Sequence, residues 1–218
     1  MKKTILSLAA LVLMTAACKK AEETPAADAT PTDSTAVKTE TAEAAKPMDS
    51  AAMMKAWKDY MTPGDAHKTL AMDNGNWDCE STMWMKPDDP NPTKTKMTGV
   101  SKMILGGRYQ ESRYTGMMMG QPFEGISTVA YNNASKQIES SWVDNMGTGL
   151  MFMKGDYDGT SKTMELKGEC TDPMTGKVKK TRETYTIVDD NTRKMEMFDT
   201  DPSGKEFKTM EMMMTRKK

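Results

Sequence analysis

The sequence predicts an all-β fold, an antiparallel up-and-down barrel of about 8–10 strands preceded by short helices. Polar and apolar residues alternate after residue 75 with the period of half-buried strands. Turn clusters interrupt this alternation at short intervals, as at Gly106-Gly107, Asn132-Asn133 and Asp158-Gly159. No helical pattern is long enough to join parallel strands, so a meander that closes on itself and hides its edges is the simplest topology.

The composition excludes several classes of function. The 218 residues include 30 Lys and Arg against 31 Asp and Glu, a net charge of -1. Nucleic-acid binding needs an excess of basic charge, so we expect no nucleic-acid partner. His67 is the only histidine, which excludes multi-histidine metal sites and makes Ser-His or Cys-His catalysis improbable. No catalytic or cofactor-binding motif stands out, so we expect neither an enzyme nor a cofactor.

Residues 1–17 have the three parts of a secretion signal: Lys2-Lys3, an apolar centre and the small residues Ala16-Ala17. The apolar centre is far shorter than the roughly 20 residues of a membrane-spanning helix. Because Cys18 follows directly, the segment resembles a bacterial lipoprotein signal, and we expect a lipid-modified Cys18 that anchors the protein to a bilayer. Lys19 differs from the Asp of inner-membrane retention signals. This difference favours an outer-membrane lipoprotein of the cell envelope, with the periplasmic or surface face left open.

Residues 18–50 are predicted to form a disordered tether. Val37 and Met48 are the only larger aliphatic or sulfur side chains after the cysteine. Such a segment buries too little apolar surface to offset the entropy lost on ordering. Its expected role is to let the folded domain stand clear of the lipid headgroups.

Residues 51–74 are predicted to form lead-in helices. Met53, Trp57 and Tyr60 recur at helical spacing, and Pro63-Gly64 separates this first helix from a second, shorter one. His67 on the second helix has two interpretations, a ligand or base on the one hand and a polar contact with the barrel floor on the other. We favour the polar contact.

Residues 75–218 are predicted to form the barrel, with one dry face. In the first strand Trp77, Cys79 and Ser81 share a face, and Leu166 and Cys170 share one further along the chain. Cys79 and Cys170 therefore both point inward. An oxidising compartment permits a disulfide between them, but their strands are far apart in order, so a possible disulfide stays open.

Two resemblances support this fold. The tripeptide Gly75-Asn76-Trp77 that opens the first strand, with Arg216 at the end of the last, is similar to lipocalin and calycin barrels. That resemblance implies that Trp77 lies at the barrel floor and that Arg216 packs across its ring as a structural closure. The region from His67 to Arg216 also resembles an uncharacterised family of bacterial secreted or lipoprotein domains, through motifs such as Leu105-Gly106-Gly107-Arg108 and Trp142-Val143-Asp144-Asn145-Met146-Gly147. The second resemblance implies a lipocalin-like barrel and no established activity.

Five residues are candidates for ligand binding. Trp142 and Asp144 lie on one strand face and either hold a ligand or belong to the core and a turn, respectively. Arg182, if it faces inward, needs an acidic ligand or a carboxylate such as Glu211. Glu211 is ambiguous, because either it or the neighbouring methionines face inward. Arg108 is placed at the rim.

We therefore expect a monomer that binds a small, largely apolar molecule in a barrel cavity. Two alternatives remain. One is a structural or interaction lipoprotein whose barrel is filled by methionines and holds no ligand. The other is a Cu(I)-binding protein, since 25 methionines offer the soft thioethers that Cu(I) prefers. No residues are assigned to a metal site.

Overall fold

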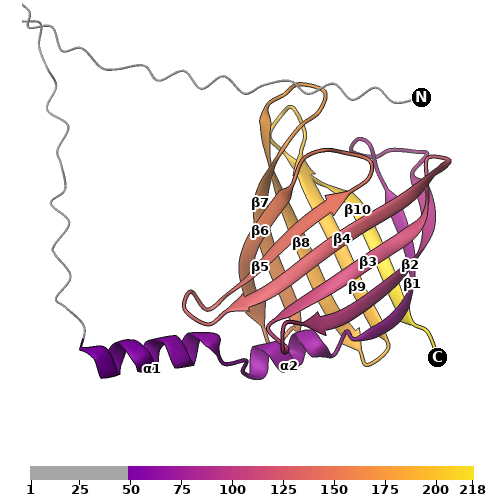
Figure 1. The fold of residues 1–218 in the computed structure, drawn as a ribbon. Helices are drawn as coiled ribbons and strands as arrows, with labels where there is room; N and C mark the ends of the chain where they lie inside the picture. Colours follow the sequence, from indigo (N-terminus) through magenta and orange to yellow (C-terminus); the bar gives the residue numbers. More distant parts are fainter. Residues whose placement is uncertain (1–48) are drawn as a thin grey trace, which may run out of the picture. The chain divides into compact units, whose positions relative to one another are not determined.

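The computed structural model describes residues 49–218 of the chain. The predicted signal peptide, the lipidation at Cys18 and nearly all of the predicted tether lie outside these residues. The described part forms a closed barrel of antiparallel strands in which each strand pairs with its neighbours in sequence and the last pairs with the first (Figure 1). The prediction of an all-β, up-and-down barrel is confirmed, with ten strands. They are β1 (Gly75–Met83), β2 (Thr93–Ile104), β3 (Tyr109–Met118), β4 (Gln121–Asn132), β5 (Gln137–Asp144), β6 (Met151–Asp158), β7 (Thr163–Thr171), β8 (Val178–Asp189), β9 (Thr192–Thr200) and β10 (Glu206–Arg216).

Two helices precede the barrel, α1 (Ser50–Met61) and α2 (Asp65–Ala71). The Asp49 side chain accepts a hydrogen bond from the Ala52 amide and so caps α1. The α2 helix lies at the end of the barrel where β1 begins (Figure 1), and its Leu70 packs into the cluster that contains Ile138 and Leu166. We call this end, covered by α2, the closed end. Neither helix is long and apolar enough to cross a membrane.

His67 makes a polar contact at the closed end. Its Nδ1 accepts a hydrogen bond from the Gly64 amide at 3.0 Å, and its ring meets Tyr131 edge-on. Burial, with a smaller contribution from the Arg108 charge, lowers the pKa of His67, so the imidazole is neutral at pH 7. This geometry agrees with the interpretation of His67 as a contact between helix and barrel floor.

A buried ion pair joins the closed end to the barrel wall. Arg193 on β9 is fully buried, and its Nε donates to Oδ1 of Asp73 at 2.6 Å. Asp73 Oδ2 also accepts from Tyr185 at 2.8 Å and from Gln110 at 3.3 Å. The remaining Arg193 nitrogens donate to backbone carbonyls, among them that of Thr192 at 3.0 Å. Every charged atom of the pair is thereby partnered, which is the condition for a buried ion pair to be tolerated.

Trp77 lies at this closed end as well. The Arg216 guanidinium lies 4.3 Å from the centre of its indole ring, and the buried Arg193 guanidinium lies 5.0 Å from it. Arg216 also donates to the backbone carbonyls of Asn74 and Met72, at 2.6 Å each. The last strand is thus attached to the segment that precedes the first strand. This contact secures the barrel where its first and last strands meet.

Both cysteines of the barrel are free thiols. Cys79 lies on β1 and Cys170 on β7, and these strands are not neighbours in the barrel. The disulfide that the sequence left open is therefore not formed. Burial raises the pKa of Cys79 to about 12, so its thiol stays protonated and packs as an apolar group.

Candidate functional site

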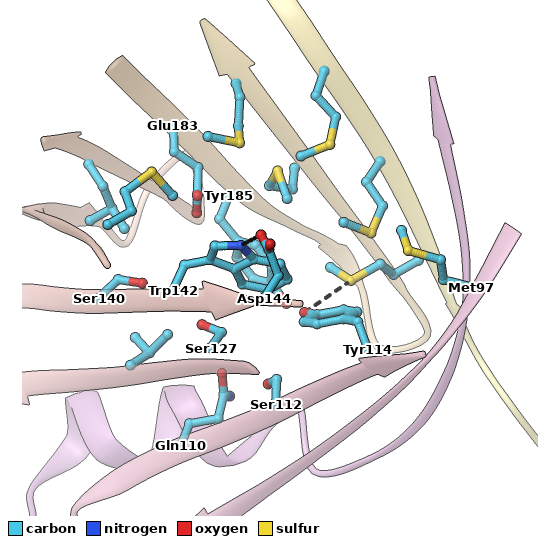
Figure 2. Close-up of a pocket in the computed structure, with 18 of the residues that line it drawn as sticks. Met97, Gln110, Ser112, Tyr114, Ser127, Ser140, Trp142, Asp144, Glu183 and Tyr185 are labelled. Atoms are coloured by element: carbon cyan, nitrogen blue, oxygen red, sulfur yellow. Dashed lines mark hydrogen bonds between the residues drawn. The ribbon is translucent and has the colours of Figure 1, made fainter. Parts of the chain in front are cut away.

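The barrel encloses a cavity of about 350 Å³ (Figure 2). This volume lies within the usual range of small-molecule sites, roughly 300–1,000 Å³. The cavity extends from Leu70 and Asp73, at the closed end, to Asp144 and Met146, at the end of β5 and in the loop after it. Its lining is mostly apolar. Ten lining residues are methionines, and half of these lie on the last two strands: Met195, Met197, Met210, Met212 and Met214.

The strand register explains this methionine surface. Met195 on β9 lies opposite Met212 on β10, and Met197 lies opposite Met210. Residues opposite each other in an antiparallel pair share a face, so these four side chains form one continuous patch. A β-bulge between Lys208 and Met210 shifts the alternation and brings the methionines of β10 to the interior.

Aromatic rings form the opposing part of the lining. Trp142 stacks on Phe123 with ring centres 6.3 Å apart, and Tyr114 is tilted against Trp142 at 5.8 Å. Gly125 makes room for this arrangement, because a Cβ atom there would lie 2.4 Å from the Trp142 ring. Trp142 and Asp144 both line the cavity, as their shared strand face predicts.

Asp144 holds Trp142 in place. Its Oδ2 accepts a hydrogen bond from the indole Nε1 at 2.7 Å, and its Oδ1 accepts one from the Met146 amide at 2.9 Å. The carboxylate therefore has local partners on both oxygens. This combines the two interpretations of the sequence: Asp144 bonds the turn amide, and it also orients the ring that faces the cavity.

Glu183 on β8 is the functional candidate that the sequence analysis missed. It lies between Leu166 of β7 and Met197 of β9, and it lines the cavity (Figure 2). No hydrogen bond or ion pair from any residue between 49 and 218 reaches its carboxyl group. Burial raises the pKa of Glu183 to about 7, because no nearby cation or donor stabilises the charged form.

The charges of the lining have one sign. Asp73, Asp144 and Glu183 line the cavity, whereas no Lys, Arg or His does so within the described part of the chain. Asp73 is paired with Arg193 and Asp144 is bonded to Trp142. Glu183 therefore carries the one cavity carboxyl group that has no partner among the described residues.

Arg182 and Glu211 do not reach the cavity, which corrects the expectation that they contact a ligand. Arg182 points outward, where its Nε and Nη2 donate to Glu206 at 2.9 and 2.7 Å and its guanidinium covers the ring of Phe198. Glu211 also points outward and pairs with Lys208. The cause is strand parity: Glu183 and Met210 occupy the inward positions of β8 and β10, so their neighbours Arg182 and Glu211 face solvent.

Arg108 lies at the closed end and not at a cavity rim. It is the last residue of the turn between β2 and β3, and its Nη1 donates to the Leu105 carbonyl at 3.1 Å. The resemblance that drew attention to Arg108 carries no information on which end of the barrel the turn occupies. The expectation is corrected accordingly.

The signals for the missed residues differ. Tyr185 and Ile187 are apolar residues of β8, and Glu183 shares their parity, so the alternation in this part of the strand indicates that Glu183 faces inward. Asp73 and Arg193 are 120 residues apart, and no local pattern links them. Their pairing follows from barrel closure.

The chain is similar to the solved structure of Rv2717c from M. tuberculosis, with a TM-score of 0.54, 14% sequence identity, and coverage of 72% of this chain and 100% of that one. It also matches a redesigned beta barrel, with a TM-score of 0.37, 13% identity, and coverage of 69% of this chain and 96% of that one. No curated protein matches. The family model described as protein of unknown function, DUF1579, matches residues 62–216, and the chain belongs to this family.

Proposed function

We propose that this protein binds a small, largely apolar molecule inside its β-barrel. The observation that carries the proposal is the cavity of about 350 Å³ in the barrel interior. A well-packed core leaves few voids larger than a water molecule, so a space of this size in a methionine and aromatic lining favours a ligand over packing alone.

The lining can adapt to apolar ligands of different shapes. Met195, Met197, Met210 and Met212 provide flexible, polarisable side chains that adapt to a bound surface. Trp142 provides a rigid face, because Asp144 fixes its ring. Apolar surface removed from water contributes about 25 cal/mol per Å², so contact with this lining favours an apolar ligand body.

The alternatives from the sequence have less support. A structural protein with a methionine-filled barrel is disfavoured by the cavity itself. A Cu(I) site would use the same thioethers, of which Met195 faces Met212 and Met197 faces Met210 across β9 and β10. That alternative stays a prediction, since thioethers in a cavity also serve as ordinary apolar lining.

Filling the cavity is expected to weaken ligand binding. Ser140 on β5 lines the cavity, whereas its neighbour Ser141 has the opposite parity and faces outward. We expect Ser140→Phe to lower the affinity for a neutral apolar probe, 1-decanol, at least about tenfold, and Ser141→Phe to leave it unchanged. Isothermal titration calorimetry measures both.

A second cavity variant provides an independent test in case Ser140→Phe does not fold. Ser127 also lines the cavity, on β4, and Ser127→Phe is expected to have the same effect as Ser140→Phe. Circular dichroism and a cooperative thermal transition establish that each variant folds. If a folded Ser140→Phe or Ser127→Phe variant binds decanol as the wild type does, the ligand site lies elsewhere.

We also propose that the protein is a lipoprotein of the cell envelope, anchored through Cys18 to the outer membrane. Its sequence supports this location through the signal-like residues 1–17. The α1 helix adds support, since its apolar side chains are exposed on one face and include the tryptophan and tyrosine types that favour membrane interfaces: Met53, Met54, Trp57, Tyr60 and Met61.

Replacing Cys18 with alanine is expected to move the protein from the membrane fraction to the soluble fraction, because an interfacial helix without acyl chains binds a membrane only weakly. Cell fractionation followed by immunoblotting measures the shift. Cys170→Ala is the matched control and should remain membrane-bound. A Cys18→Ala protein that stays with the membrane would show that lipidation is not the anchor.

A further inference from the structure

We propose that the molecule held in the cavity is a lipophilic amine, whose protonated nitrogen pairs with Glu183 while its apolar body lies against the methionine and aromatic lining. This inference rests on the proposed ligand-binding function and names the chemical class of the ligand. Three independent features of the cavity point to this class: an unpartnered carboxyl group, a lining with charge of one sign, and aromatic faces.

The first feature is the carboxyl group of Glu183. It faces the cavity between Leu166 and Met197, and no donor from residues 49–218 reaches it. Glu183 is half-buried, and a carboxyl group in such a site without a partner costs free energy unless it stays protonated or gains a cation. Burial raises the pKa of Glu183 to about 7, so near neutral pH it is ready to ionise once a cation arrives. An ammonium group on the ligand supplies both the charge and the hydrogen-bond donors.

The second feature is the sign of the surrounding charge. Asp73 and Asp144 also line the cavity, and the described lining contains no basic side chain. Lys179 is the nearest inward-facing lysine by strand parity, but it pairs with Asp199 beyond the lining. An anionic amphiphile such as a fatty acid would therefore place its carboxylate beside Glu183 with no cation to receive it. A protonated amine meets no such repulsion.

The third feature is the set of aromatic faces. Tyr185 is the next inward residue after Glu183 on β8, and Tyr114 and Trp142 line the same cavity (Figure 2). Phe123 lines it as well. Aromatic faces attract ammonium groups by roughly 0.5–2 kcal/mol, more when the cation is desolvated. The same rings offer apolar surface to the alkyl part of the ligand. Carboxylate and aromatic faces together select an organic cation over an inorganic one.

Three matched ten-carbon ligands test the inference on the full-length chain: decylamine, 1-decanol and decanoate. At pH 7 we expect decylamine to bind at least about tenfold more tightly than decanol, and decanoate to bind more weakly than decanol. Glu183→Gln should lower the affinity for decylamine at least about tenfold and change the affinity for decanol less than about twofold. Glu169→Gln, an exposed glutamate on β7, is the matched control and should change neither.

The possible outcomes distinguish a failure of the amine inference from a failure of the proposed ligand binding in the cavity. If decylamine and decanol bind wild-type protein equally, or if Glu183→Gln keeps the preference for the amine, the amine inference is wrong and cavity binding stands. If decanol, decylamine and decanoate all fail to bind wild-type protein, both proposals fail. Glu183→Gln removes an unpartnered carboxyl group and keeps its shape, so the variant is expected to fold.

Discussion

Replacing Arg193 with methionine is expected to lower the free energy of unfolding by about 3–5 kcal/mol. Arg193 is fully buried, and the substitution leaves the Asp73 carboxylate inside the protein without its cation. It also removes donors from backbone carbonyls at the closed end, including that of Thr192. Removal of one member of a buried pair costs far more than the pair itself contributes, because the remaining charge is left desolvated.

Arg182→Met is the matched control for this experiment. Arg182 also covers an aromatic ring and also pairs with a carboxylate, but its partner Glu206 lies at the barrel surface. We expect a loss of about 1 kcal/mol or less for Arg182→Met. Urea denaturation measures both variants at pH 7. Similar losses for the two variants would contradict the assignment of Arg193 and Asp73 as the pair that secures the closed end.

Ligand-free protein is expected to lose stability through Glu183 as the pH rises from about 4.5 to about 7. Between these values the folded state keeps a proton on Glu183 that the unfolded chain has released, so the folded state binds more protons and raising the pH favours unfolding. Above about 7 both states are ionised and the loss levels off. The total is on the order of 3 kcal/mol.

His67 also titrates near this window, and its lowered pKa has the opposite effect on stability, which the difference between wild type and Glu183→Gln cancels. The strand neighbours of Glu183, Leu166 and Met197, are apolar, and burial raises the pKa values of Tyr114 and Tyr185, so both phenols stay neutral. The other charged or titratable groups that face the interior are Asp73 with Arg193, Asp144, Lys179 with Asp199, and the thiols of Cys79 and Cys170, whose pKa values burial raises. Surface carboxyl groups with lowered pKa values, such as that of Asp158, contribute stability that is lost below about pH 4.

The measurement is the difference in unfolding free energy between wild type and Glu183→Gln at several pH values. We expect the free energy of unfolding of the variant to rise relative to that of the wild type from about pH 4.5 to about pH 7. Above about pH 7 the difference should stay constant. Glu169→Gln should show no such trend. A difference that does not change with pH would mean that Glu183 has an ordinary pKa and is not confined in an apolar cavity.

The sequence predicts the barrel well because its evidence is local. Alternation in β1 and β7, and turn clusters such as Asn132-Asn133, are readable without knowledge of distant contacts. The same alternation places Trp142 and Asp144 on one face. It left Glu211 open, because Glu211 alternates with methionines and the pattern alone does not say which set faces inward.

The remaining parts of the site depend on contacts across the barrel. Asp73 meets Arg193 only after 120 residues, and the absence of a partner for Glu183 is a property of the folded interior. Arg182 shows the opposite difficulty, since a cation next to an inward residue invites a functional interpretation until its partner Glu206 is seen outside. Local patterns give strand faces, whereas pairing and cavity volume require the closed structure.

The central claim is that the barrel interior is a binding site, and the methionine methyl groups test it most directly. In protein labelled with carbon-13 at the methionine methyls, we expect decylamine to shift the resonances of Met195, Met197, Met210 and Met212. Met174, which is 92% exposed, should stay unchanged. Shifts confined to exposed methionines, or no shifts at saturating ligand, would contradict a ligand site inside the barrel.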